Sequence, residues 1–588
     1  MIMTDEHHFK TLGCYRDLME EKHAFPWGKG AKVDTPNIDR LANEGAIFKN
    51  YYTVTPLCTP SRASFMSGKY PTKTGESYQN HGAMDESIVT FAEYLRNKKD
   101  YYTGYFGKWH LDGKPKPGIG VESNARKFGF VENKYRVNRG HWKFFDIVDW
   151  NVEVFEYNKK SEGMFEGRME ENYSTDFLFD RGIDFIKRQI RRENHFAMVL
   201  SISDPHAPND VRPPYDTMYK DMNFQLPETA VMAAKGEPSI PFWTMVGNAI
   251  KEGDADEVLK EKETDDFYQR YMMEYFGMVK LLDDNVGKLL GFLDQQNLTN
   301  NTIIVFTSDH GDQLWEHGKM NKGTAYEGSL KIPHIIRYPN KIPAGKVIEE
   351  PFTSIDFTPT ILGMMGVEVN DAEQNFDGID ASSFLLNNET DRSLLGDNHI
   401  RFAFDVAKQG KGRWASAIMQ DLKLVLSKQE VPWLFDLKRD PDEVINFYND
   451  PEYQNVTSLL KSALLVEVND KNIPNSFFDD SKLVLWDTPK CRDSPDAIQK
   501  YKWGFCSQIS TDGVSRKYSN RRCDWKFVKE ACPLTCNLCC EDSEGFMMKR
   551  SELLSCASLV KKGMCNQKKV QDFCPKSCGM CQDQSIVE

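Results

Sequence analysis

The chain has 588 residues, of which 40% are hydrophobic and 12% aromatic, so it is long enough for several domains with large cores. Its formal net charge of −13 argues against a surface that binds nucleic acid or an anionic membrane. The sequence contains no run of about 20 apolar residues and therefore predicts no membrane span.

The first residues are typical of a buried strand. Ile2 and Met3 fit the end of such a strand, and we expect its beginning to lie before residue 1. The stretch 1–6 does not form a signal peptide, so none is present in the chain as given.

Strand-like and helix-like stretches alternate up to about residue 340. Buried strands are predicted at 101–106, 196–202, 302–307 and 332–337. An amphipathic helix is predicted over 271–293, because Met272, Phe276, Val279 and later apolar residues recur on one face. This alternation favours an α/β fold with a mostly parallel central sheet sandwiched by helices. In such a fold, ligands bind at the carboxyl ends of the strands.

The pattern changes after about residue 396. Short strand-like pieces at 422–426 and 433–435 predict a small α+β subdomain, and 475–490 is a predicted linker. We therefore expect a catalytic domain at 1–395, and a C-terminal subdomain with its linker at 396–490.

The tail is rich in cysteine. Of the 14 cysteines, only Cys14 and Cys58 precede residue 490. The others form two sets, at 491–539 and 540–581, and each set ends in Cys-Pro-x-x-Cys-x-x-Cys. This density predicts two disulfide-rich modules in an oxidising compartment, although Cys-x-x-Cys also occurs in metal sites. Five glycosylation acceptors agree with a secreted or lumenal protein: Asn172, Asn297, Asn300, Asn388 and Asn455.

An unusual thiol motif stands at Cys58-Thr59-Pro60-Ser61-Arg62. A proline lies two places after the thiol and an arginine four places after it. On its own, the run is also compatible with an ordinary cysteine in a proline-containing turn.

Three further motifs carry cationic side chains. Lys108 and His110 lie two residues apart, so in an extended segment they would share one side. His206 is held in Asp204-Pro205-His206-Ala207-Pro208, and Lys322 lies within 317–327. Taken singly, each of these is also typical of a structural histidine or a surface lysine.

A metal site is predicted from carboxylates at two strand ends. Asp309 and His310 follow the strand at 302–307, and Asp5 and Glu6 end the first strand. Two or three carboxylates around one site repel one another strongly unless a cation is bound there.

Together these motifs, in this order, resemble the signatures of the type I, formylglycine-dependent sulfatases of the alkaline-phosphatase-like superfamily. The stretch 67–72 extends the match after Cys58, and the resemblance covers about residues 1–450. It implies that a formylglycine-generating enzyme oxidises Cys58 to formylglycine, whose hydrate is the nucleophile. The implied catalytic residues are Cys58, Arg62, Lys108, His110, His206 and Lys322.

The implied metal ligands are Asp5, Glu6, Cys58, Asp309 and His310. Calcium is the ion that the resemblance implies, with Mn²⁺, Mg²⁺ or zinc as alternatives. Many sulfatases have Asp-Asp where this chain has Asp5-Glu6, which leaves the role of Glu6 open. Many also have Asn in place of His310, and other branches have Asp-His.

The tail resembles two ShK toxin-like modules, which usually serve attachment to protein or matrix. In the first module the resemblance implies the disulfides Cys491–Cys539, Cys506–Cys532 and Cys523–Cys536. In the second it implies Cys540–Cys581, Cys556–Cys574 and Cys565–Cys578.

We therefore expect a sulfatase that hydrolyses sulfated carbohydrates or small sulfate esters. One alternative is a phosphonate or phosphate monoester hydrolase on the same scaffold. Another is a catalytically inactive binding protein whose function is carried by the cysteine-rich tail. The sequence does not distinguish between substrates, and it leaves the oligomeric state open.

Overall fold

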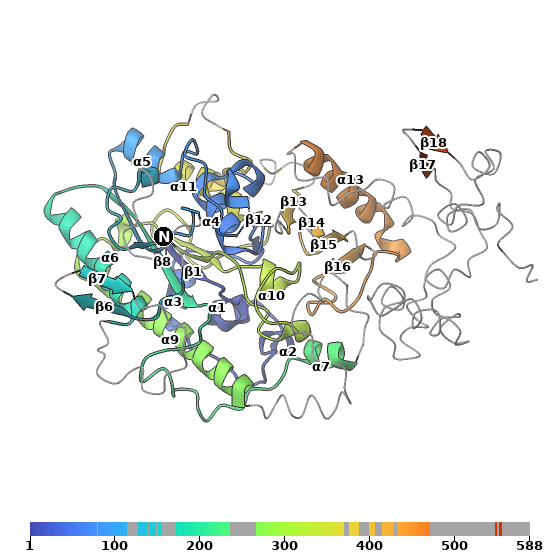
Figure 1. The fold of residues 1–588 in the computed structure, drawn as a ribbon, viewed down its shortest axis with the longest axis horizontal. Coiled ribbons are helices and arrows are strands. Elements are labelled where there is room, and N and C mark those ends of the chain that lie inside the picture. Colours follow the sequence, from blue (N-terminus) through green and yellow to red (C-terminus); the bar gives the residue numbers. More distant parts are fainter. Residues whose placement is uncertain are drawn as a thin grey trace, which may run out of the picture.

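Figure 1 shows the fold in a computed structural model of the chain. The structure describes residues 1–470 apart from 79, 114–126, 139, 149–150, 155–171, 236–265, 370–374, 387–394, 396–398, 406–413 and 428–431, and beyond these 547–549 and 552–554. None of the helices in this described part combines the length and the apolar character that crossing a membrane requires.

An eight-stranded sheet forms the centre of the protein, in the order β11-β2-β10-β9-β1-β8-β4-β5. Within this sheet β10 is antiparallel to both its neighbours, and the other pairs are parallel. The predicted mostly parallel sheet is thereby confirmed, and β1 lies inside it. The strands are β1 (Ile2–Asp5), β2 (Ala46–Phe48), β4 (Tyr102–Lys108), β5 (Arg136–Val137), β8 (Phe196–Pro205), β9 (Ile304–Ser308), β10 (His334–Arg337) and β11 (Lys346–Ile348).

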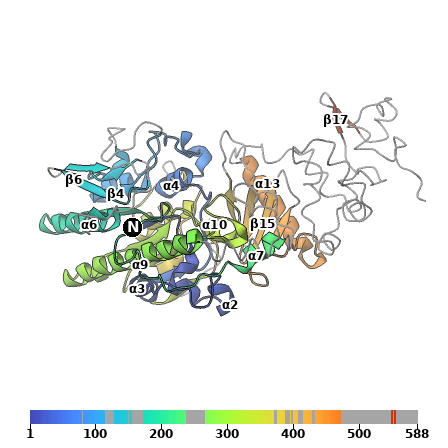
Figure 2. The same cartoon turned by 60° about the horizontal axis from the view of Figure 1, so that its bottom comes forward.

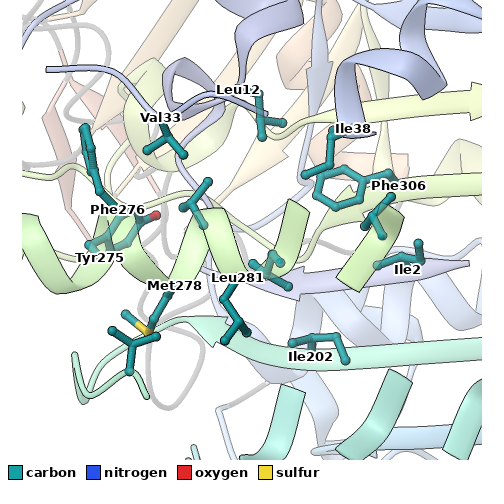
Figure 3. Packing of buried hydrophobic residues seen from close by; sticks show 14 of the residues in the cluster. Ile2, Leu12, Val33, Ile38, Ile202, Tyr275, Phe276, Met278, Leu281 and Phe306 are labelled. Atoms are coloured by element: carbon teal, nitrogen blue, oxygen red, sulfur yellow. The ribbon is translucent and has the colours of Figure 1, made fainter. Parts of the chain in front are cut away.

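Helices cover both faces of the sheet, and Figure 2 shows α3 and α9 on the side opposite to α4. Figure 3 shows Phe276 and Leu281 of α9, Ile202 of β8 and Phe306 of β9 as members of one buried apolar cluster, with Leu281 close to Ile202. All four side chains are fully buried, because the apolar residues of α9 recur at helical spacing on the face toward the sheet. One layer contains α3 (Pro36–Asn43), α6 (Ser174–Arg191) and α9 (Asp266–Gln295), and the other contains α4 (Cys58–Ser67), α5 (Phe91–Lys99), α11 (Phe357–Met364) and α12 (Ser382–Leu386).

Shorter elements connect these layers. They are α1 (Gly13–Arg16), α2 (Glu21–Ala24), α7 (Glu228–Lys235) and α10 (Glu327–Leu330), the 3₁₀ helix η8 (Glu316–Gly318), and the strand pairs β3 (Tyr51–Tyr52) with β12 (Phe352–Thr353) and β6 (Phe145–Val148) with β7 (Asn151–Val154).

The predicted C-terminal subdomain is confirmed as a four-stranded antiparallel sheet with one helix, and it lies beside α10 in Figures 1 and 2. One apolar cluster joins this sheet to α13, and a second joins it to the segment that contains α10. The elements are β13 (Arg401–Phe404), β14 (Trp414–Met419), β15 (Leu422–Ser427), β16 (Trp433–Asp436) and α13 (Gln454–Asp470).

In the tail the structure describes one short hairpin, β17 (Met547–Lys549) with β18 (Glu552–Leu554). The predicted disulfides of the two modules and the acceptor Asn388 lie outside the described residues.

Candidate active site

Four strands of the central sheet deliver polar side chains to one edge. Asp5 ends β1 and Lys108 ends β4, while His206 follows β8 and Asp309 follows β9. These strands are neighbours in the sheet and run parallel. Their carboxyl ends therefore bring together side chains that lie far apart in the sequence.

Cys58 is the first residue of α4, so the thiol motif is helical rather than a turn. Arg62 lies four residues later and one helical turn along, on the same face. The Ser61 hydroxyl donates to the Asp309 carbonyl over 2.6 Å, which ties the start of α4 to the end of β9. Gly68 ends the helix in a left-handed conformation with φ of 69°.

Asp5, Cys58, Asp309 and His310 form a compact, fully buried cluster. Their ligand-type atoms all lie within 4.8 Å of one another. His310 Nε2 is 3.2 Å from Cys58 Sγ and 3.7 Å from Asp5 Oδ1. The opposite ring nitrogen, Nδ1, lies 3.0 Å from the Gly311 carbonyl, and donation to that oxygen leaves Nε2 with a lone pair that faces the cluster.

The two aspartates of this cluster have pKa values that are shifted in opposite directions. Burial opposes ionisation of Asp5, but the Lys108 ammonium together with His206 and His141 outweighs it and holds the pKa of that carboxyl well below its usual range. Burial raises the pKa of Asp309, although the Arg62 guanidinium opposes this shift. Arg62 Nε donates to Asp309 Oδ2 over 2.8 Å, and its Nη2 lies 3.6 Å from Asp5 Oδ2.

These donors fit a divalent cation. Two carboxylates and an imidazole nitrogen lie within 4.8 Å of one another, a set of donors that suits Ca²⁺ or Mn²⁺. Within the described part of the chain, the buried Arg62 Nη2 has no hydrogen-bond partner, so one donor at the edge of the cluster is available to a further anionic group.

Glu6 lies on the cationic side of the site rather than in the cluster of four. Its Oε2 is 2.9 Å from His206 Nε2 and 3.2 Å from Lys322 Nζ, and its backbone φ is 61°. His206 Nε2 and Lys322 Nζ are 2.7 Å apart. The role of Glu6 as a metal ligand stays a prediction, whereas its contacts pair it with two cationic groups.

The backbone conformation that orients His110 differs from the one that the sequence predicted. β4 ends at Lys108, and His110 has φ of 62°, so the expected extended segment with both side chains on one side is wrong. The left-handed backbone at His110 redirects the side chain away from the direction of the strand. His110 Nε2 lies 2.6 Å from Nδ1 of His81, which belongs to the segment after α4.

The two candidate proton-transfer histidines have opposite pKa shifts. Burial lowers the pKa of His206, but the carboxylates of Glu6 and Asp5, together with the contact to Cys58, outweigh it and raise the pKa to about 9. Burial lowers the pKa of His110 to about 3. At neutral pH, His206 is therefore protonated and His110 neutral, as an acid and a base require.

His141 is a site residue that the sequence motifs missed. Its ring stacks on His206 with centroids 3.5 Å apart, and its Nε2 lies 2.7 Å from Lys108 Nζ and 3.3 Å from Asp5 Oδ2. It belongs to a stretch without a motif, where the available signal was the rarity of histidine, 12 in 588 residues.

A buried ion pair holds His141 and His206 together. Lys143 Nζ lies 2.5 Å from Asp204 Oδ1 and donates to the His206 carbonyl over 2.9 Å. Tyr173 and Thr175 donate hydroxyl hydrogen bonds to the other oxygen of Asp204. The segment that carries His141 is thus anchored to the turn that carries His206.

Family models match three parts of the chain. The model described as Sulfatase matches residues 1–367, and that described as N-sulphoglucosamine sulphohydrolase, C-terminal, matches residues 315–470. The model described as ShK domain-like matches residues 516–539 and 540–581.

Curated relatives resemble most of the chain. The N-acetylglucosamine-6-O-sulfatase of Bacteroides thetaiotaomicron is 26% identical over 535 residues, which are 82% of this chain and 88% of that protein. The N-acetylgalactosamine-6-sulfatase of Mus musculus is 25% identical over 512 residues, 78% of this chain and 86% of that protein.

Solved structures share the fold. A protein in complex with its substrate D-glucosamine-2-N,6-O-disulfate matches with a TM-score of 0.60 at 23% identity, over 81% of this chain and 98% of that chain. The phosphonate monoester hydrolase of Agrobacterium radiobacter matches with a TM-score of 0.57 at 20% identity, over 80% of this chain and 95% of that chain.

Lys143→Met is expected to lower the free energy of unfolding by about 3–5 kcal/mol, because it leaves the Asp204 carboxylate buried without its cation. The double variant Lys143→Met/Asp204→Asn should lower the free energy of unfolding by less than Lys143→Met alone, since a neutral amide needs no counter-charge. Urea unfolding measures this coupling. Lys288→Ala, which removes an exposed pair with Asp180, is the control and should change stability by about 0.5 kcal/mol or less. Additive losses in the double variant would contradict the coupling.

Proposed function

We propose that this chain, which belongs to the sulfatase family and is a sulfuric ester hydrolase, releases sulfate from sulfated carbohydrates with a formylglycine made from Cys58 and a bound divalent metal. The supporting observation is the position of Cys58. Its thiol lies beside two buried aspartates and His310, and the cations around it include Arg62 and Lys108.

A strongly cationic environment supports the nucleophilic role of position 58. Burial acts to raise the pKa of the Cys58 thiol, but the ammonium groups of Lys108 and Lys322, together with His310 and His110, outweigh it and hold that pKa well below its usual range. The same charges would stabilise any anionic oxygen at this position. As formylglycine, the residue would supply a hydrated aldehyde as an oxygen nucleophile.

Asp5, Asp309, His310 and position 58 are the residues that would hold the metal. A divalent cation there would draw electron density from sulfate oxygens and from the nucleophile. Arg62 keeps the Asp309 carboxylate in place, and Lys108 does the same for Asp5. Ca²⁺ is our proposed ion, because oxygen donors outnumber the single nitrogen.

The cations opposite the cluster would bind the sulfate group and its leaving oxygen. His206 is protonated at neutral pH and can donate a proton to the departing alcohol, with Lys322 beside it. His141 stacks on His206 and its Nε2 lies beside Lys108 Nζ and Asp5, so Lys108 and His141 can donate hydrogen bonds to sulfate oxygens there. His110 remains neutral and can accept a proton from position 58.

A secreted or lumenal location fits the cysteine-rich tail, and Asn297, Asn300 and Asn455 are exposed and accessible for glycosylation. The proposed partners are a formylglycine-generating enzyme during maturation, and protein or matrix at the ShK-like modules. The carbohydrate substrate is inferred from relatives that are named as sugar sulfatases.

Cys58→Ala is expected to lower the turnover of sulfate esters by at least about 10⁴-fold, because it removes the nucleophile. Mass spectrometry of the peptide that spans Cys58, from protein made in a eukaryotic secretory host, should reveal an aldehyde. Cys14→Ala, at the other described free cysteine, is the control and should keep its activity. A peptide that contains thiol only, or full activity in Cys58→Ala, would contradict the proposal.

Glu6→Gln should shift the alkaline limb of the pH–rate profile to lower pH. The pKa of His206 is about 9, and the Glu6 carboxylate is the largest of the contributions that raise it, so without this charge the imidazolium loses its proton at lower pH. Elemental analysis should find the metal retained in Glu6→Gln and lost in Asp309→Asn. If Glu6→Gln and Asp309→Asn lost the metal equally, the result would indicate that Glu6 is a metal ligand.

A substrate panel separates the proposal from its main alternative. The value of kcat/KM should be at least about 10-fold higher for an aryl sulfate than for the matching aryl phosphate or phosphonate monoester, a difference of about 1.4 kcal/mol in transition-state binding. Among sulfate esters of natural type, kcat/KM should be higher for sugar 6-sulfates than for choline sulfate. A preference for the phosphonate would favour the alternative function.

A further inference from the structure

Lys322 lies on irregular backbone between η8 and α10. Its neighbours Asn321 and Gly323 have positive φ angles of 61° and 94°. A non-glycine residue in the left-handed region is retained only where surrounding contacts hold it there. The direction of the Lys322 side chain therefore depends on tertiary contacts rather than on a helix or a strand.

Two parts of the protein supply these contacts. On the upstream side, Asp312 Oδ1 accepts from the Asn321 amide over 2.8 Å, and the Gln313 amide donates to the Asn321 carbonyl over 2.8 Å. On the downstream side, the Trp414 indole of β14 donates to the Gly323 carbonyl over 3.2 Å. The C-terminal sheet thus contacts the residue directly after Lys322.

An apolar layer extends this contact along the chain. Trp414 is fully buried, and Tyr326 and Leu330 pack in the same cluster as side chains of the C-terminal sheet. The sheet members of the cluster are Ala403, Trp414, Ile418, Val425, Trp433 and Phe435.

A buried charge cluster lies in the same interface. Lys423 Nζ of β15 is 2.6 Å from Glu327 Oε1 and 2.6 Å from Glu443 Oε1. The other Glu443 oxygen accepts from the Glu327 amide over 2.7 Å. The side chains of Lys423, Glu327 and Glu443 are 0%, 9% and 3% exposed.

We propose that the Lys423–Glu327–Glu443 cluster, together with the Trp414–Gly323 hydrogen bond, positions Lys322 in the active site, so that the C-terminal subdomain is required for the geometry of catalysis. Buried ion pairs are weak sources of stability compared with apolar groups of the same volume, but they allow few alternative geometries. Lys423 is therefore a positioning residue. This inference rests on the proposed role of Lys322 beside the leaving oxygen.

Lys423→Met is the first test, in the full-length, metal-loaded protein. It leaves two carboxylates facing each other, which should displace the segment 322–327. A displacement of about 1 Å at a reacting group can lower kcat by about 10²-fold. We expect that loss on an alkyl sulfate, whose poor leaving group needs protonation, and a much smaller loss on 4-nitrophenyl sulfate. A merely structural role would lower both rates equally.

Leu424→Ala is the matched control. Leu424 is adjacent on β15 but packs in the cluster with α13, so its truncation loosens the same subdomain without touching 322–327. It should leave the ratio of the two rates unchanged. The same change of ratio in both variants would overturn the proposal.

Two further measurements keep the test decisive. If Lys423→Met does not fold, Glu443→Gln keeps the Lys423–Glu327 pair and should show a smaller change in the same direction. A crystal structure of whichever variant folds should show Lys322 Nζ displaced from its position 3.2 Å from Glu6 Oε2. An unmoved Lys322 would overturn the inference. Wild-type protein without turnover of either ester would instead refute the proposed function, while the crystal structure would still test the positioning.

Discussion

Charge balance at the carboxyl end of β1 is the constraint on which the rest of the site depends. Asp5 and Asp309 are both fully buried and share one small cluster. Carboxylates so placed repel each other strongly in a poorly solvated interior, so cations must be held against them. The protein supplies these cations from separate elements: Arg62 comes from α4, and Lys108 ends β4. The parallel sheet makes this possible, because it gathers the ends of several strands at one edge.

The same electrostatics separates the roles of the histidines. His206 has a carboxylate, Glu6, at 2.9 Å and therefore keeps its proton. His110 is buried beside cationic groups and remains neutral. His141 stacks on His206 while its Nε2 reaches Asp5. Burial also lowers the pKa of His141, to about 4, so His206 is the charged ring among these three at neutral pH. Residue identity alone therefore does not assign an acid and a base.

Buried ion pairs outside the site hold its irregular segments in place. Lys143 and Asp204 join the segment of His141 to the turn of His206. At the opposite side, Lys423 and Glu327 join the segment after Lys322 to the C-terminal sheet. Side chains on loops need such support, because no regular hydrogen-bond ladder restricts their backbone. The C-terminal subdomain is in this sense continuous with the active-site scaffold.

The sequence by itself determined the α/β class, the strands that deliver Asp5, Lys108, His206 and Asp309, and the sulfatase family. These follow from local information: hydrophobic periodicity, and the identity and spacing of residues in short motifs. Only the tertiary structure decided that Glu6 faces His206 and Lys322, that His110 turns away from the strand direction, and that His141 joins the site. The physical reason is distance along the chain, since contacts such as Lys322–His206 and Glu327–Glu443 each join residues 116 positions apart. Local patterns carry no information on which segments the sheet will bring together.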